Sequence, residues 1–404
     1  MERRPFEGLK VLDFTWTGVG PFTVNYLAYY GATVIKVESP VRPDPLRSLS
    51  PFKDGIPGLE RSYYFAQTHS AKKYGITLNL EHSKGIELAK RLVAWSDVVV
   101  DSFTTGIMEK WGLDYDSLKK IKHDIIMLRT CMHGHTGPLA KHHGQGFVLT
   151  GLSGLDAITG WPDRPPCGLY GAFTDFIAPL FNVASLIAAL DYRRRTGKGQ
   201  YIDQSQHEAV MHLIAPLILD YTVNQREPCA NGNRLAYAAP HGVYRCQGDD
   251  RWCAIAVFTD DEWECFCRVI GNPAWAYDPR FRTILGRKQS EDELDRLVEE
   301  WTRKHSAEEV MTLMQEAGVG AGVVADAKDQ AEDPQLRHYH HFWKLDHPEM
   351  GELSIYHGPG FSLSKTPYEV GRPPLLGEHN DYVYAQLLGI PDEEWVQLIA
   401  EGVI

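Results

Sequence analysis

The sequence predicts an α/β protein whose larger part is built on a mostly parallel sheet, accompanied by a smaller α+β domain. Three observations lead to this prediction. The first 130 residues alternate strand-like and helix-like periods, a pattern typical of βαβ units. The length of 404 residues exceeds the roughly 250–300 residues that a single core usually accommodates. Beyond the middle of the chain, the alternation gives way to a different mixture of strands and helices.

A strand, a helix and a second strand open the chain. Residues 10–14 and 33–37 are rich in β-branched and apolar side chains, and the helix between them covers 21–30. Pro21 fits the first turn of that helix, where the N–H that it lacks would have no helical partner. The elements expected next are a strand at 76–80, a helix at 83–94 capped by Ser83, and strands at 98–100 and 125–129.

Two long helices follow. The apolar run 176–190 ends in the basic stretch Arg193–Arg195 and Gly197. Basic side chains favour the negative end of a helix, and glycine supplies a left-handed cap, so the helix should end there. A second helix is expected at 205–224, and a polar linker at 225–234 closes this part of the chain.

The smaller domain is expected at residues 225–325. Its predicted elements are strands at 242–246 and 252–257, helices at 261–270, 290–304 and 306–316, and a strand at 319–325. Residues 326–404, which include a strand at 351–357, are expected to return to the first domain. We therefore predict a large domain of residues 1–224 plus 326–404 and a small domain of residues 225–325.

Composition excludes several partner classes. The net charge of −12 argues against nucleic acid and against an anionic membrane surface. No apolar run approaches the roughly 18 residues of a membrane span, and the first residues lack the apolar stretch of a signal peptide. Seven cysteines without a paired framework are typical of a reducing compartment, so we expect a cytoplasmic protein.

Asp175 is the most informative single residue. It lies at the start of the apolar run 176–190. A carboxylate there either caps that helix or is a reactive group held beside a positive helix end. Capping is the commoner role, and Asp175 alone does not decide between the two.

Four ordered motifs favour the reactive interpretation. They are the segment 6–15 with Gly18-Val19-Gly20-Pro21, the strand region 96–103, Thr196-Gly197-Lys198-Gly199-Gln200, and Pro374-Leu375-Leu376-Gly377-Glu378-His379. In this order and spacing the chain resembles the class III CoA-transferase family, which includes formyl-CoA transferases, carnitine CoA-transferases and acyl-CoA racemases. The resemblance runs nearly end to end. Asp175 falls where that family carries its catalytic aspartate.

The resemblance implies a Rossmann-like large domain and a dimer interlinked like two rings, either a homodimer or a heterodimer with a paralogue. It implies coenzyme A or an acyl-CoA as substrate, with no tightly bound cofactor. An aromatic-rich N-terminal half would suit a bulky acid, and this favours the subset that acts on succinyl-CoA and benzylsuccinate-like acids.

By position in the family, several residues would contact CoA. Trp16, Thr17 and Gly18 would meet its adenosine. The remaining positions carried over are Lys73 and Lys110 for phosphates, and Ser102, Phe103, Cys131 and His133 along the pocket. The basic residue that the family often has after the second strand is Ser39 here, so Arg42 or Arg47 would have to replace it.

Two other kinds of site are disfavoured. A nicotinamide fingerprint needs a third glycine where this chain has Thr23, although Gly18 and Gly20 precede a helix. The histidines at 133, 135, 142 and 143 lack the spacing and the cysteine or carboxylate partners of a zinc site, so no metal is expected.

The predicted function is a CoA-transferase that works through a covalent aspartyl intermediate, a mixed anhydride followed by an aspartyl-CoA thioester. Two alternatives stay open. An acyl-CoA racemase exchanges the α-proton with an aspartate and a histidine, but this chain has Gln145 at the histidine position, with His143 two residues away. A non-catalytic partner subunit would bind CoA without turnover.

Overall fold

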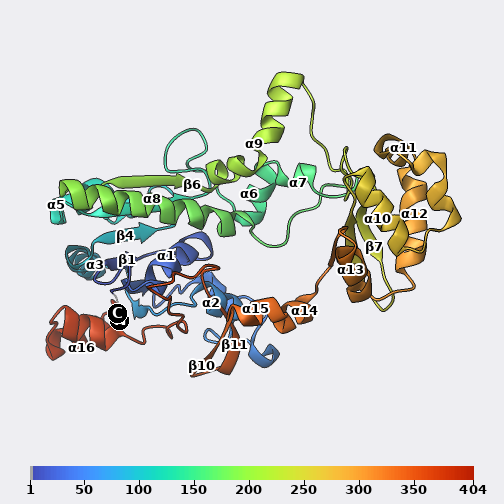
Figure 1. Ribbon diagram of the computed structural model, residues 1–404. Coiled ribbons are helices and arrows are strands. Elements are labelled where there is room, and N and C mark those ends of the chain that lie inside the picture. The colour runs from blue at the N-terminus through green and yellow to red at the C-terminus, as the bar shows by residue number, and fades with distance from the viewer. Residues whose placement is uncertain (1–2) are drawn as a thin grey trace. The chain divides into compact units, whose positions relative to one another are not determined.

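Six parallel strands form the central sheet, in the order β3-β2-β1-β4-β5-β6 (Figure 1). They are β1 (Lys10–Asp13), β2 (Thr33–Glu38), β3 (Tyr74–Thr77), β4 (Val98–Asp101), β5 (Ile126–Cys131) and β6 (Tyr201–Ser205). This is the strand order of doubly wound nucleotide-binding sheets, in which the order reverses between the first and fourth strands. The predicted parallel sheet is confirmed.

The computed structural model describes residues 3–404, which divide into two compact units. The first holds the central sheet and comprises the chain up to Asp156, Gly168–Glu227 and Gln335–Ile404. The second comprises Ala157–Cys167 and Pro228–Pro334. Periodicity gave no sign that the short segment 157–167 joins the second unit.

The described helices that precede residue 228 follow in chain order. They are α1 (Val19–Tyr29), α2 (Tyr63–Thr68), α3 (Ser83–Trp95), α4 (Ile107–Lys110), α5 (Tyr115–Ile121), α6 (Gly146–Leu152), α7 (Leu155–Ile158), α8 (Thr174–Thr196) and α9 (Gln206–Asn224). A 3₁₀ turn at Pro45–Ser48 lies in the loop after β2. The C-terminal part adds α15 (Pro334–His338), the hairpin β10 (Phe342–His347) and β11 (Gly351–His357), a π-helix at Asp381–Leu387, and α16 (Asp392–Ala400).

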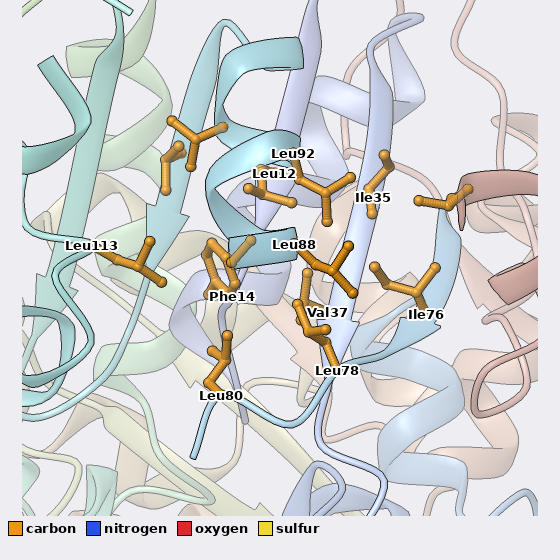
Figure 2. Packing of buried hydrophobic residues seen from close by; sticks show 14 of the residues in the cluster. Leu12, Phe14, Ile35, Val37, Ile76, Leu78, Leu80, Leu88, Leu92 and Leu113 are labelled. Atoms are coloured by element: carbon orange, nitrogen blue, oxygen red, sulfur yellow. The ribbon is translucent and has the colours of Figure 1, made fainter. Parts of the chain in front are cut away.

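Both faces of the sheet are buried, because successive side chains of a strand point to opposite faces. Leu12 and Ile35 pack in one apolar cluster, whereas their neighbours Val11 and Val34 pack in another. In the first cluster, Leu88 and Leu92 of α3 point at the sheet (Figure 2). The near-continuous apolar strands of the sequence are explained by this two-sided burial.

The second unit is an α+β structure with its own core. Its antiparallel sheet has the order β7-β8-β9, with β7 (His241–Arg245), β8 (Trp252–Ala256) and β9 (Gly320–Val323). Its helices are α10 (Asp260–Val269), α11 (Ile284–Gln289), α12 (Glu291–Thr302), α13 (Ala307–Glu316) and α14 (Ala327–Glu332). Capping boxes begin α10 and α13, where Thr259 and Ser306 each bond the backbone N–H three residues on.

Two described strands, β6 and β10, are absent from the elements predicted above. β6 was assigned to no element, because the motif Tyr201-Ile-Asp-Gln-Ser has little apolar character. It lies at the edge of the sheet beside β5, where a half-polar strand is tolerated. The helix after it begins one residue later than predicted, with Ser205 as its N-cap.

α8 is the longest helix among the described residues, and it ends as predicted, with Gly197 in the left-handed conformation (φ 70°). By length and composition it is also the single described helix that could cross a membrane, a test that the core helix of a soluble protein passes as well. Only 33% of its most apolar window is buried. Large apolar side chains are exposed along α8 and α9, among them Leu180, Ile187, Leu213, Ile218, Leu219 and Val223.

Candidate active site

The loops after β1 and β4 meet at the point where the strand order reverses. The Trp16 N–H donates to Ser102 Oγ at 2.9 Å, and that hydroxyl donates to the Trp16 carbonyl at 3.2 Å. The rings of Trp16 and Phe103 touch edge to face, with centroids 5.4 Å apart. Ligands of doubly wound sheets bind outside the carboxyl ends of the strands at this reversal. Three predicted site residues are therefore in contact there.

Asp175 does not cap its own helix. α8 begins at Thr174, after Phe173 in helical conformation, and no side chain caps it. The Asp175 carboxyl instead lies against Gly18, the residue that precedes α1. A Cβ added to Gly18 would stand 2.5 Å from Asp175 Oδ2, so any other side chain at this position would displace the carboxyl. The structure thus decides against the capping interpretation.

Gln206 is the polar partner of this carboxyl. Its Oε1 accepts a hydrogen bond from Thr174 Oγ1 at 2.9 Å, which turns the amide nitrogen toward Asp175. Burial raises the pKa of Asp175 to about 7, and the hydrogen bond from Gln206 only partly opposes this rise. Near neutral pH the site therefore holds a basic, poorly solvated carboxylate in balance with its acid.

The two lysines predicted to contact phosphates lie in different environments, one in the interior and one at the surface. Lys73 is fully buried, with its ammonium 3.6 Å from Asp13 and donating to the Pro21 carbonyl at 3.4 Å. Burial lowers its pKa to about 8. Such a lysine is part of the interior and does not present its charge to a ligand phosphate, which corrects that expectation. Lys110 is exposed on α4 and pairs with Glu81 at 2.6 Å.

Of the two arginines offered as replacements for the missing basic residue, only Arg42 is accessible. Its guanidinium lies 5.8 Å from the centre of the Trp16 ring. Arg47 is buried and pairs with Glu38 at 2.8 Å and with Glu60 at 2.5 Å, so it supports the loop from inside.

Cys131 is the last residue of β5, and His133 lies two residues beyond it. Burial raises the pKa of Cys131 to about 11, so its thiol stays neutral and does not compete as a nucleophile. His133 Nε2 lies 3.2 Å from His142 Nδ1, and its ring centroid lies 5.3 Å from that of His207. Among the residues whose side chains the structure describes, no group of three or more His, Cys, Asp or Glu is arranged to hold a metal ion.

Gln145, at the position of the racemase histidine, lies near the segment that leads into α8 and Asp175. Gln145 immediately precedes α6, and a Cβ added to Gly146 would lie 2.1 Å from the Cβ of Ala172. An amide in that place does not exchange a proton near neutral pH. His143 is exposed.

Comparison with known proteins decides the family. The model described as CoA-transferase family III matches residues 6–380. The chain belongs to the family III CoA-transferases. Its resemblance to that family is thereby confirmed, as is its being an enzyme of this kind.

Two relatives and one solved structure match this chain over nearly its whole length. The succinyl-CoA–D-citramalate CoA-transferase of Chloroflexus aurantiacus is 33% identical, covering 99% of this chain and 98% of the relative. The succinyl-CoA–L-malate CoA-transferase beta subunit of the same organism is 30% identical, with the same coverage of 99% and 98%. A crystal structure of a CAIB/BAIF family protein from Brucella suis superimposes with a TM-score of 0.86 at 32% identity, covering 96% of this chain and all of that one.

Sequence reasoning missed Gln206 and Asp44. Gln206 follows β6, which was itself missed, and only the fold brings it to Asp175. Asp44 lies in the proline-rich loop after β2, where it is fully buried and accepts the Thr17 N–H at 3.1 Å. A charged residue among prolines gave no sign of that burial.

Replacing Asp175 with Asn should stabilise the protein at pH 8. The folded-state pKa is raised to about 7, so the acid form stabilises the fold at low pH, and that contribution is lost as the pH rises through 7. Asparagine carries no charge to bury. Allowing for partial solvent access, we expect a gain of about 1–2 kcal/mol at pH 8 and little at pH 5, measured by urea unfolding. A loss at both pH values would instead indicate a helix cap.

Proposed function

We propose that this enzyme moves CoA from an acyl-CoA, in particular succinyl-CoA, to a small carboxylic acid through a covalent intermediate on Asp175. The observation that carries this proposal is the carboxyl of Asp175, half-buried beside Gly18 and bonded by a neutral amide, at the reversal point of the sheet. A carboxylate with little water around it and no demanding structural role is suited to attack a thioester.

The reaction follows from what CoA exchange requires. The Asp175 carboxylate attacks the thioester carbonyl, the C–S bond breaks, and a mixed anhydride and a CoA thiolate result. The thiolate then attacks the aspartyl carbonyl and releases the first acid, which leaves an aspartyl-CoA thioester. The acceptor carboxylate repeats both steps in reverse, so atoms and charge balance without water, metal or redox partner.

The start of α1 supplies groups that suit the charged intermediates. The first N–H groups of a helix have no acceptor within it, and in α1 these belong to the residues directly after Gly18. Gly18, which precedes them, lies against the Asp175 carboxyl, so we propose that the N–H groups of Val19 and Gly20 stabilise the oxyanions, whereas Pro21 has no N–H to donate. Such preorganised donors typically contribute a factor of about 100 or more in rate.

Arg42, Trp16 and Phe103 form the proposed adenine end of the CoA site. An indole with a second ring at its edge offers a flat apolar surface, and the exposed guanidinium of Arg42 offers a positive charge beside it. Ser102 fixes the loop that carries Trp16. Lys110, Cys131 and His133 remain proposed contacts along the pocket, whereas Lys73 is proposed to act only from the interior.

The names of the relatives support the substrate class. Both Chloroflexus enzymes are named for succinyl-CoA as donor, and both acceptors, D-citramalate and L-malate, are small dicarboxylic acids. We propose a dicarboxylic acid as acceptor here too, with benzylsuccinate-like acids as the aromatic extreme of that class.

A second chain is proposed to cover the apolar side of α8 and α9. Exposed apolar surface on this scale is unusual for a chain that works alone in water. An interlinked homodimer would bury it, and a heterodimer would do the same, since one relative is named a beta subunit. The cytoplasm is the compartment proposed for such an assembly.

Removing the nucleophile should abolish transfer. We expect Asp175→Ala and Asp175→Asn to lower the turnover of succinyl-CoA by at least about a thousandfold while CoA still binds. Hydroxylamine added with succinyl-CoA should modify Asp175 in the unaltered enzyme, as detected by peptide mass spectrometry. Modification of another residue, or activity above a few per cent in Asp175→Ala, would reject this assignment.

The rate of acyl transfer to Asp175 should increase with pH, as it does when the reacting group must be deprotonated. Only the ionised carboxylate attacks, and its pKa is raised to about 7 by burial, so the single-turnover rate should rise from pH 5.5 and level off above about 7.5. Quenched-flow measurement of thioester loss gives the profile. A rate that is constant across this range would contradict a nucleophile with a raised pKa.

A charge on the α8–α9 face should disrupt the assembly. We expect Leu219→Arg to shift the mass measured by light scattering from that of an assembly toward that of one chain, because an arginine cannot be buried there unpaired. Val396→Arg on α16, an equally exposed apolar position, serves as the control and should leave the mass unchanged. Equal masses for all three proteins would contradict the proposed interface.

A further inference from the structure

We propose that Asp44 is a positioning residue, whose buried carboxylate holds the Thr17–Gly18 backbone in the conformation against which the Asp175 carboxyl lies. The inference rests on the proposed role of Asp175 as nucleophile and extends it to a residue about 130 positions away that does not touch the substrate. Asp44 itself takes no part in the reaction.

Thr17 is held in an unfavourable backbone conformation. Its φ is 57°, in the left-handed region, which is rare for any residue other than glycine and most of all for a β-branched one. The next residue is Gly18, whose backbone packs against the Asp175 side chain. A residue in this conformation persists only where its surroundings hold it.

Asp44 supplies that hold. Its carboxylate accepts the Thr17 N–H, at 3.1 Å to Oδ2 and 3.3 Å to Oδ1. The carboxylate is itself fixed, because Oδ1 also accepts the Leu46 N–H at 3.0 Å and the Asp44 N–H donates to Glu38 Oε1 at 3.0 Å. Thr17 is thus bonded to a side chain that has little freedom to follow it.

A lysine and a histidine flank the Asp44 carboxylate, and burial lowers the pKa of the histidine well below its usual value, so the lysine is the one cation of the two. Lys36 Nζ lies 3.8 Å and His69 Nε2 3.4 Å from its Oδ2, and all three side chains are fully buried. Lys36 Nζ also donates to the carbonyl of Thr15. The backbone is therefore anchored on both sides of Trp16, by Lys36 before it and by Asp44 after it.

The consequence for catalysis is geometric. Without the hydrogen bond from its N–H to Asp44, Thr17 would relax toward a negative φ. Gly18 and the start of α1 would then move relative to Asp175. Attack on a thioester is sensitive to displacements well below 1 Å, so the acylation rate should fall although no reacting group has been removed.

The alternative is that Asp44 only stabilises the loop of residues 39–58. Asp97 provides a matched control for this case. It is a partly buried carboxylate that accepts the N–H of Lys10 at 3.0 Å and pairs with Lys122 at 3.1 Å. Lys10 begins β1, whereas Thr17 follows the other end of that strand. Asp97→Ala should destabilise the sheet without moving Thr17.

The experiment measures the single-turnover rate of Asp175 acylation by succinyl-CoA, with hydroxylamine trapping and mass spectrometry. We expect Asp44→Ala to be slower by at least about tenfold per folded molecule, Asp44→Asn to be intermediate because it keeps an acceptor oxygen, and Asp97→Ala to match the unaltered enzyme. Hydrogen exchange should increase selectively in the peptide that contains Thr17 and Gly18 in the Asp44 variants.

A glycine rescue separates positioning from loop stability. Glycine adopts the left-handed conformation without penalty, so Asp44→Ala with Thr17→Gly should acylate at least about threefold faster than Asp44→Ala alone. Each of three results would overturn the inference. They are equal acylation rates in Asp44→Ala and the unaltered enzyme, a loss of rate in Asp97→Ala as large as that in Asp44→Ala, and no rescue by glycine. Failure to label Asp175 in the unaltered enzyme would instead overturn the proposed nucleophile.

Discussion

The withdrawal of one carboxyl group from water is the constraint on which the rest of this structure depends. Asp175 lies where its carboxyl meets the backbone of Gly18 and the amide of Gln206. Burial favours the neutral acid, and an amide compensates far less than a cation would. The same condition that makes this carboxylate costly to the fold makes it basic and poorly solvated, as a nucleophile should be.

Other carboxylates on this edge of the sheet are also buried, but each of them has a cation as its partner. Asp13 faces Lys73, Glu38 faces Arg47, and Asp101 accepts a bond from Arg129 at 3.0 Å. A cation beside a buried carboxylate offsets its loss of hydration, so these groups can hold loops in place without being reactive. This contrast separates the structural charges from the functional one. It also explains why a lysine assigned to CoA belongs to the interior.

α8 connects the site with the proposed partner surface. Its first turn carries Asp175, and its exposed side carries large apolar groups such as Leu180 and Ile187. A helix fixed by a second chain would hold its first turn more firmly than one that is open to water. The proposed assembly and the proposed nucleophile are therefore linked through one element.

The sequence by itself determined the parallel sheet and most of the long helices, and it singled out Asp175 as the candidate nucleophile, because period, end signals and ordered motifs are local properties of the chain. Gly197, for example, ends α8 for reasons that its own neighbours supply. Only the tertiary structure decided that Asp175 is no cap, that Gln206 bonds it, and that Asp44 holds Thr17. Burial and long-range contact decide these roles, and both depend on which distant segments the folded chain brings together.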